Sequence, residues 1–336
     1  MDAGLVLAVL LAIAFAVTNG LHDASNAIAT LVATRAATPG QAIAMASVFN
    51  LLGPLLLGAA VADTIGGIVT VAPAEAVAVI GSGLAAAVGW NLVTWRLGIP
   101  SSSGHALVGG LVGAALVAGG VDAVRWGGLD GWHPVGVIGT LVALAVSPLL
   151  GLLAAVFAIR GLRRAARRAT RRWAPPVKVG EWGASAALAF SHGANDAQKA
   201  VGVVAALLLA SGHIDSLAAP LWVKVACAAA LTAGTALGGW RIIRTVGRGI
   251  YRIRPVEGLA SQTASAGVTF AASVVGAPVS TSQVVACSVV GVGAGRRRWH
   301  HVHWSVVRQM GVAWLITIPA AALLGGAVVG LWGWVA

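Results

Sequence analysis

Long apolar segments separated by short polar ones form the pattern of this chain. A helix needs about 20 apolar residues to cross the hydrocarbon core of a bilayer, and most of these segments reach that length. They cover residues 4–34, 41–62, 75–97, 100–120, 133–159, 180–210, 217–240, 258–276, 278–294 and 304–335. The pattern predicts an all-α, polytopic membrane protein with about 10 to 12 transmembrane or re-entrant helices.

Three of the apolar segments, 4–34, 180–210 and 304–335, are longer than one simple span. A segment of this length is expected to form a tilted helix or a broken one. Pro319 is the expected break in the last segment, because proline lacks the backbone N–H that a helix interior uses.

Composition and charge support a membrane protein and exclude two other classes. Of the 336 residues, 58% are hydrophobic and 10% are charged, whereas soluble domains carry roughly 25% charged residues. The net charge of +12 suggests nucleic acid at first, but the basic residues are confined to short loops between apolar segments. Cys227 and Cys287 both lie inside apolar segments, so no disulfide framework is indicated.

The basic residues also predict an orientation in the membrane. They gather at residues 160–178, 241–254 and 296–298. Alternating spans place all three clusters on the cytoplasmic side, as the positive-inside rule requires, and both termini outside. Residues 1–4 lack a basic leader region, so we expect the first apolar segment to be retained in a multi-pass protein of the cell (inner or plasma) membrane.

Two motifs occur twice, in the same order. Residues 19–27 resemble residues 192–200 at an offset of 173, and residues 98–105 resemble residues 276–283 at an offset of 178. Each half crosses the membrane an odd number of times if the pair of segments around each Pro-Ser motif returns to the side from which it entered. The two halves then have opposite orientations in the membrane. Inverted repeats with a site at the bilayer midplane are a transporter architecture. We therefore predict a first inverted repeat at 1–160, a basic cytoplasmic loop at 161–179 and a second inverted repeat at 180–336.

The first motif places a carboxylate inside an apolar span in each half. Charged side chains in a membrane normally face a cavity, a partner or an ion. We predict that Asp23, Asn26, Asn195, Asp196 and His22 bind and couple a cation, with Na⁺ at the first four or H⁺ on a carboxylate.

The acidic motif is compatible with local unwinding of the helix and also with a purely structural polar pair. Gly20 and Gly193 are expected to allow local unwinding that frees backbone carbonyls as ligands. The plainer alternative is a buried polar pair that ties helices together, for example Asp196 with Lys199.

The second motif predicts an anion site. In each half a Gly-x-Pro sequence precedes Ser and Thr and then an apolar run, which indicates a capped helix start. Free backbone N–H groups, the helix dipole and hydroxyl donors together suit a tetrahedral oxyanion. The predicted substrate-binding residues are Ser102, Ser103, Ser280, Thr281 and Ser282. Ordinary capping at a hairpin tip is the alternative.

The two motifs together favour symport. An anion and two carboxylates repel one another strongly where the dielectric constant is low, and bound cations or protons remove that repulsion. No cofactor is expected beyond the coupling ion.

At these residues the chain resembles the inorganic phosphate transporter (PiT) family. The resemblance covers essentially the whole chain and is carried by residues 19–30, 98–110, 191–202, 278–283 and 314–320. It implies a Na⁺- or H⁺-coupled phosphate symporter, a homodimer in membrane lipid, with the predicted site residues at the family's cation and phosphate positions. Gly104 departs from the family's usual Ser, and Ser282 and Gln283 depart from its usual Thr and His.

Three other functions compete with this one. The first is symport of sulfate or another oxyanion, which the family includes. The second is an intramembrane serine protease that uses Ser103 and His105, but the second copy has Gln283 where the base is needed. The third is a channel or a structural membrane protein, against which the buried carboxylates of both halves argue.

Overall fold

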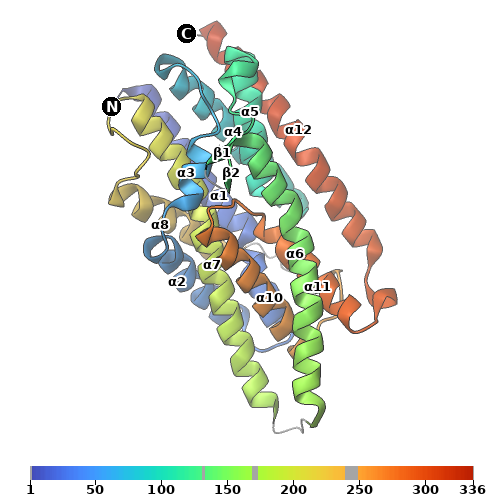
Figure 1. The fold of residues 1–336 in the computed structure, drawn as a ribbon. Coiled ribbons are helices and arrows are strands. Elements are labelled where there is room, and N and C mark those ends of the chain that lie inside the picture. The colour runs from blue at the N-terminus through green and yellow to red at the C-terminus, as the bar shows by residue number, and fades with distance from the viewer. Residues whose placement is uncertain (1, 131–132, 169–172, 239–248, 336) are drawn as a thin grey trace.

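The computed structural model describes residues 2–335, apart from 131–132, 169–172 and 239–248 (Figure 1). Arg171, Arg172, Arg241, Arg244 and Arg248 of the predicted basic clusters lie outside the described residues. The helices are α1 (Ala3–Ala33), α2 (Pro39–Leu56), α3 (Ala60–Gly66), α4 (Pro73–Leu97), α5 (Ser103–Gly119), α6 (Gly136–Ala165), α7 (Ala174–Ala210), α8 (Leu221–Leu237), α10 (Pro255–Val274), α11 (Thr281–Gly295) and α12 (Trp304–Val335). Two short strands, β1 (Leu129–Asp130) and β2 (His133–Pro134), pair antiparallel.

The three long apolar segments are continuous helices, so the alternative of broken helices is wrong for them. Each forms one element, α1, α7 or α12, and Pro319 lies within α12 without ending it. A break occurs instead in the segment 41–62, between α2 and α3. Gln198 of α7 accepts a hydrogen bond from Val61 N (3.0 Å) and donates one to the Gly58 carbonyl, so α7 satisfies backbone groups that the break leaves free.

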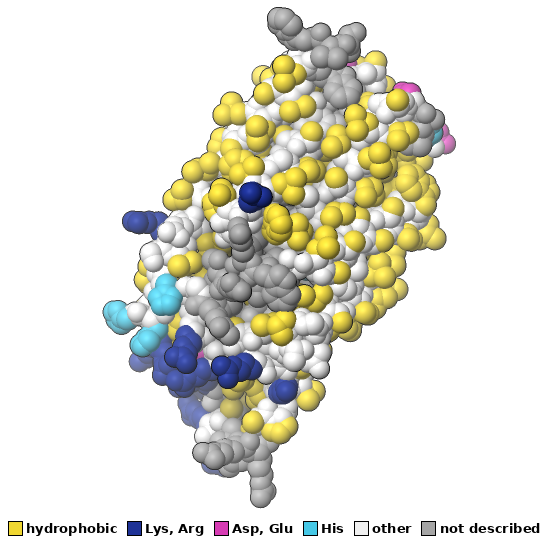
Figure 2. Space-filling model, turned by 180° about the vertical axis from the view of Figure 1, so that it is seen from behind, with side chains coloured by type: hydrophobic (Ala, Val, Ile, Leu, Met, Phe, Trp, Pro, Cys, Tyr) yellow, Lys and Arg dark blue, Asp and Glu magenta, His cyan; other side chains and the backbone are white. Residues whose placement is uncertain are grey.

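The outer surface is that of a membrane protein. Among the described residues, five helices, α1, α2, α4, α6 and α12, are long and apolar enough to cross a membrane. Apolar side chains cover most of the face in Figure 2, and most Lys, Arg and His side chains gather at one end. The N-terminal end of α1 and the C-terminal end of α12 lie toward the opposite end (Figure 1). Much of the predicted basic loop is helical, because α6 continues to Ala165 and α7 begins at Ala174.

Helix packing follows the sequence repeat. Helix α1 packs on α8 as α7 packs on α2, α5 packs on α12 as α11 packs on α6, and α4 packs on α1 as α10 packs on α7. Exchanging each helix for its counterpart in the other half therefore returns the same set of pairs, as a duplicated architecture predicts.

Gly20 and Gly193 allow helices to approach closely. A Cβ at Gly20 would overlap the Leu231 carbonyl of α8, and a Cβ at Gly193 would overlap the Asn50 carbonyl of α2. Small residues at membrane helix crossings have this effect. Because α1 and α7 are continuous at these glycines, the expectation of local unwinding there is wrong.

Two helical hairpins carry the Pro-Ser motifs to the interior. Gly98 follows α4 with φ 70° and Gly276 follows α10 with φ 71°, a left-handed conformation that favours glycine. The chain then reaches the buried starts of α5 and α11, which have 17 and 15 residues. At about 26 Å and about 23 Å, these helices are shorter than the hydrocarbon core. In Figure 1 the α4–α5 hairpin lies in the upper half and the α10–α11 hairpin in the lower half, as inverted repeats predict.

Candidate functional site

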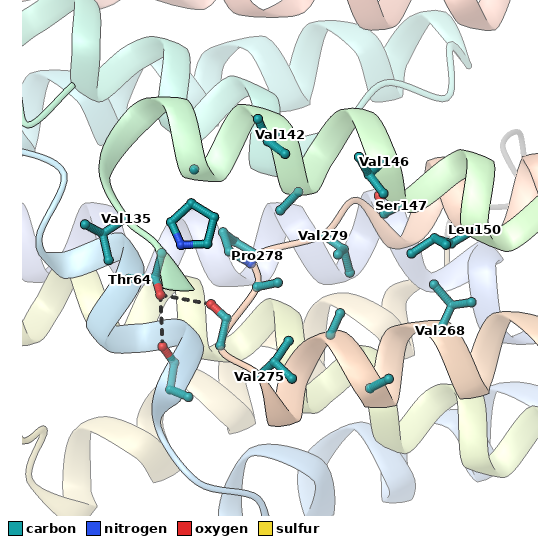
Figure 3. Close-up of a pocket in the computed structure, with 18 of the residues that line it drawn as sticks. Thr64, Val135, Val142, Val146, Ser147, Leu150, Val268, Val275, Pro278 and Val279 are labelled. Carbon is teal, nitrogen blue, oxygen red and sulfur yellow. Dashed lines mark hydrogen bonds between the residues drawn. The ribbon is translucent and has the colours of Figure 1, made fainter. Parts of the chain in front are cut away.

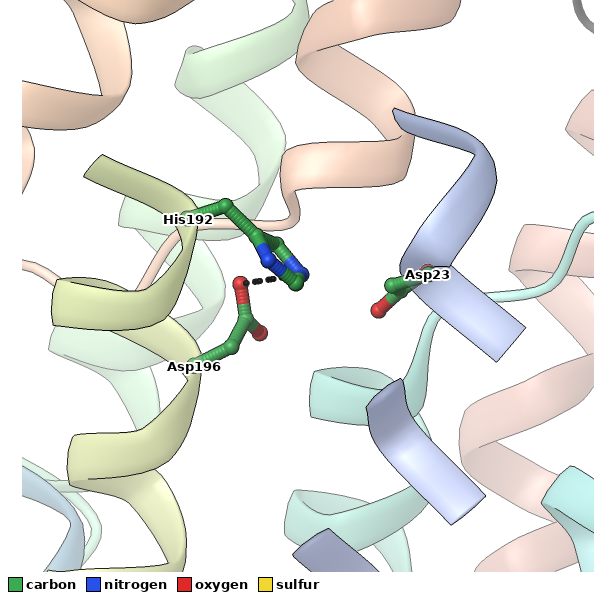
Figure 4. Close-up of side chains that lie close together, drawn as sticks. All are labelled: Asp23, His192 and Asp196. Carbon is green, nitrogen blue, oxygen red and sulfur yellow. Dashed lines mark ion pairs between the residues drawn. The ribbon is translucent and has the colours of Figure 1, made fainter. Parts of the chain in front are cut away.

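The carboxylates of the two halves meet in the interior. Asp23 of α1, Asp196 of α7 and His192 of α7 are buried, and one ligand atom from each lies within 4.8 Å of the others. Figure 4 shows the three side chains pointing toward one another, with His192 Nε2 3.5 Å from Asp196 Oδ2. The fold therefore joins two carboxylates that are 173 residues apart in the sequence into one cluster.

Hydroxyl groups from both hairpins bind Asp23. Ser103 at the start of α5 donates to Asp23 Oδ2 at 2.9 Å and also lies 2.8 Å from Asn19 Oδ1. Ser282 at the start of α11 donates to Asp23 Oδ1. Asn26, one turn further along α1, donates from Nδ2 to the Ser282 hydroxyl at 3.1 Å. Asp23 thus connects the tip of each hairpin to α1.

Asp196 has a different set of partners. Thr281 donates to Asp196 Oδ2 at 2.7 Å, as Ser103 does to Asp23. Lys199 donates from Nζ to Asp196 Oδ1 at 2.6 Å and to the Val279 carbonyl at 2.7 Å. Both side chains of this ion pair are buried. The polar pair left open by the sequence is therefore present, and it lies within the site.

Asn195 and His22 occupy equivalent positions beside the carboxylates. Asn195 Nδ2 donates to Ser273 Oγ and to the Ala277 carbonyl, both at 3.1 Å, and Val279 N donates to Asn195 Oδ1 at 3.2 Å. The Asn195 amide thereby holds the loop that precedes α11. His22 Nδ1 lies 3.5 Å from Asp23 Oδ1, and its Nε2 lies 3.3 Å from the Thr94 hydroxyl.

The remaining predicted hydroxyls cap the two buried helices. Ser102 accepts from His105 N at 3.3 Å, and Ser280 accepts from Gln283 N at 3.4 Å. The Gln283 Nε2 atom lies 3.3 Å from His105 Nδ1, so the first turns of α5 and α11 face each other. Two helix N-termini with their partial positive charges therefore converge beside the carboxylates.

Sequence reasoning left two residues out of the predicted site. Lys199 and His192 belong to the second copy of the acidic motif, 173 residues after Asn26 and Asn19. The same offset that relates Asp23 to Asp196 was the available signal. Both side chains now prove to lie against Asp196.

A cavity of about 1200 Å³ lies behind the second hairpin tip, between α3, α6 and α10. Apolar side chains such as Val142, Leu150 and Val268 form most of its wall, and the Pro278–Val279 backbone closes its inner side (Figure 3). The Thr64 hydroxyl near one end lies within hydrogen-bonding distance of two carbonyls, those of Ala60 at 3.2 Å and Gly276 at 2.9 Å. Leu150 is exposed, so the cavity opens on the apolar outer surface. Asp23 and Asp196 are not among the residues that line it.

Comparisons with known proteins show the family to which the chain belongs. The model of the phosphate transporter family matches residues 19–325. A "probable low-affinity inorganic phosphate transporter" of Mycobacterium tuberculosis is 41% identical over 329 residues, with 97% of this chain and 77% of the relative covered. A Bacillus subtilis protein of the same description is 38% identical, with 97% of both chains covered.

A solved structure is similar over the full length. It is described as "the sodium-dependent phosphate transporter", with a TM-score of 0.85, 25% sequence identity and 100% of both chains covered. The family and these relatives are transporters rather than enzymes, which argues against the protease alternative. The chain is a multi-pass membrane protein and belongs to the phosphate transporter family.

Proposed function

We propose that this protein is a secondary active symporter that imports inorganic phosphate together with Na⁺ or H⁺. The observation that carries the proposal is the position of Asp23. It receives hydroxyl hydrogen bonds from Ser103 of one hairpin and Ser282 of the other. The same hydroxyls that suit an oxyanion are therefore bound to a carboxylate that suits a cation.

Coupling follows from competition for these hydroxyl protons. Ser103, Ser282 and Thr281 each have one O–H, which they donate to a carboxylate in this structure. An anion at the hairpin tips draws those protons toward itself and leaves the carboxylate without donors. A cation or proton on Asp23 then restores the balance of charge, because an unpaired charge is very unfavourable in this buried place. Anion and cation therefore favour each other's binding.

The first turns of α5 and α11 supply the rest of the anion site. Their backbone N–H groups and dipoles attract negative charge. Since His105 and Gln283 are in contact, an anion between the two tips reaches both helix starts at once. Alternating access at the membrane midplane requires these hairpins to move relative to α1 and α7, and the inverted repeats provide one such arrangement for each side.

Phosphate is favoured over sulfate by chemistry as well as by relatives. Phosphate retains a proton that it can donate to Asp23 or Asp196, whereas sulfate has none to donate, and a buried acceptor left unpaired lowers affinity. The relatives are named as phosphate transporters. We further propose that the protein lies in the inner or plasma membrane with both termini outside, because most of the basic side chains visible in Figure 2 lie at the opposite end. The homodimer that the family resemblance implies is part of the same proposal.

Uptake of radiolabelled phosphate into proteoliposomes tests the proposal. One arm has an imposed Na⁺ gradient at equal pH, and the other has a proton gradient at equal Na⁺. We expect one gradient to drive saturable accumulation that excess unlabelled phosphate blocks and sulfate does not. Uptake of sulfate alone would favour the alternative oxyanion symporter, and linear flux that ignores both gradients would favour a channel.

A further inference from the structure

The two halves place different residues at one equivalent position of the site. The offset of 173 that relates Asp23 to Asp196 also relates Asn26 to Lys199. In the structure both residues lie one helical turn beyond their aspartate. Asn26 donates to Ser282 of the opposite hairpin, whereas Lys199 donates to the Val279 carbonyl of its own half and lies beside Gly104 of the opposite hairpin. A neutral amide in the first half therefore corresponds to an ammonium group in the second.

A second difference complements the first. Asp23 accepts a hydrogen bond from Ser282 of the second hairpin, and the equivalent position of the first hairpin, Gly104, lies beside Lys199. These positions are related by the offset of 178. A Cβ at Gly104 would lie 3.4 Å from Lys199 Nζ, at the near limit of ordinary van der Waals contact. The glycine thus leaves the space that the lysine fills.

The surroundings of Asp23 consist of oxygen atoms and neutral donors. The carboxylate accepts from the Ser103 and Ser282 hydroxyls, and the Asn26 amide donates to Ser282. The imidazole of His22 is 3.5 Å away, and His192 and Asp196 complete the cluster within 4.8 Å. Oxygen ligands of this kind suit a hard monovalent cation. The Lys199 ammonium at Asp196 is itself a compact cation with three donors, of which two are bound to oxygens at 2.6 and 2.7 Å.

We propose that the ammonium group of Lys199 permanently takes the place of a coupling cation in the second half, so that the carboxylate pair binds one exchangeable cation, at Asp23. This inference rests on the proposed function of cation-coupled phosphate symport. It assigns the two halves separate tasks: the first binds and releases the coupling ion, and the second carries a fixed positive charge that offsets Asp196 throughout the cycle.

The double substitution Lys199→Asn with Gly104→Ser tests this by giving the Asp196 site the residues found at the equivalent positions of the Asp23 site, Asn26 and Ser282. Phosphate accumulation at equilibrium is measured in proteoliposomes at zero membrane potential over a series of Na⁺ gradients at equal pH. A pH series replaces it if only protons drive the wild type. The slope of log accumulation against log gradient equals the number of coupled cations. We expect the slope to rise by one, so a tenfold gradient supports about tenfold more accumulation than in the wild type.

The reciprocal variant, Asn26→Lys with Ser282→Gly, gives the Asp23 site the residues found at the equivalent positions of the Asp196 site, Lys199 and Gly104. With both carboxylates then paired to lysines, we expect accumulation to lose its dependence on the cation gradient. Because Ser282 belongs to the predicted anion site, thermal unfolding of the purified variant in detergent, and not phosphate transport, is the check that it is folded.

The outcomes separate the inference from the proposed function. If the wild type shows no cation-driven phosphate uptake, the proposed function fails. If the wild type is coupled but the Lys199→Asn, Gly104→Ser variant keeps the wild-type slope, the inference is overturned. Weaker phosphate affinity at an unchanged slope also overturns it, because Lys199 would then serve as an anion ligand only.

A binding measurement covers the case in which that variant does not fold. Thermal unfolding of purified protein in detergent is followed while NaCl, or pH for a proton-coupled wild type, is varied at constant ionic strength. We expect stabilisation by a single class of cation that Asp23→Asn abolishes and that the paired removal Asp196→Asn with Lys199→Met retains at the same midpoint. Loss of that stabilisation in the paired variant would overturn the inference.

Discussion

Asp23 and Asp196 occupy equivalent positions of a duplicated motif, yet the structure satisfies them in different ways. Asp23 binds the hydroxyls of Ser103 and Ser282, whereas Asp196 binds the hydroxyl of Thr281 and the ammonium of Lys199. Packing and hairpin geometry are shared by the halves, but the charge of the site is not. The framework of helices is therefore similar in the two halves, while the two carboxylates have different partners.

The largest effect is expected for Asp196→Asn. This change leaves the Lys199 ammonium buried without its carboxylate, and breaking a buried ion pair in this way costs about 3–5 kcal/mol. We expect a marked loss of thermal stability in detergent together with loss of phosphate uptake. The control is Asp196→Asn combined with Lys199→Met, which removes both charges and should recover most of the stability. Wild-type stability of the single variant would show that the pair is not a strong interaction.

Asp23→Asn is expected to abolish transport with little effect on folding. The amide keeps an oxygen that accepts from Ser103 and Ser282 but loses the negative charge that holds the cation. We expect uptake to fall by about 100-fold or more, equivalent to roughly 3 kcal/mol, with unfolding stability within about 1 kcal/mol of the wild type. Full uptake by this variant would remove Asp23 from the coupling mechanism and would make the halves equivalent in function.

Much of the framework could be predicted from the sequence. The apolar segments located the described helices because lipid requires every span to satisfy its own backbone, and hydropathy reports that requirement directly. The break between α2 and α3 was missed, since the residue that stabilises it, Gln198, lies on α7, far away in the sequence. The long segments were expected to be tilted or broken on length alone, and length does not distinguish these cases.

The chemistry of the site was predictable only in part. The repeat indicated Asp23, Asp196 and the hairpin hydroxyls, because offsets in a duplicated sequence imply equivalent places in space. It did not show that Lys199 lies beside Gly104, since this contact joins α7 to the start of α5 across 95 residues. Which of two buried carboxylates is already paired depends on distances, and a sequence supplies charges without distances.

A smaller effect is expected for Ser282→Ala. The change removes one of the two hydroxyl hydrogen bonds to Asp23 and leaves the Asn26 amide without its acceptor. Hydrogen bonds to charged groups contribute about 1.5–3 kcal/mol, so we expect the cation concentration for half-maximal uptake to rise about 10-fold. The measurement is uptake against cation concentration at saturating phosphate. A shift in phosphate affinity alone would place Ser282 at the anion and not at the cation.

The smallest effect is expected for Gly104→Ala. This variant is the counterpart of Ser282→Ala, because Gly104 and Ser282 occupy equivalent positions in the two halves. No hydroxyl is lost, and the new methyl group meets Lys199 Nζ at about the 3.4 Å that close packing allows. Because the ammonium lies at the end of a flexible side chain, it can shift by a few tenths of an ångström while keeping Asp196. We expect uptake within about 3-fold of the wild type and a stability change below about 1 kcal/mol. If uptake fell as far as in Ser282→Ala, the space at Gly104 would have to admit a cation or an anion during the cycle. The site at Asp196 would then bind an exchangeable ion, as the site at Asp23 is proposed to do.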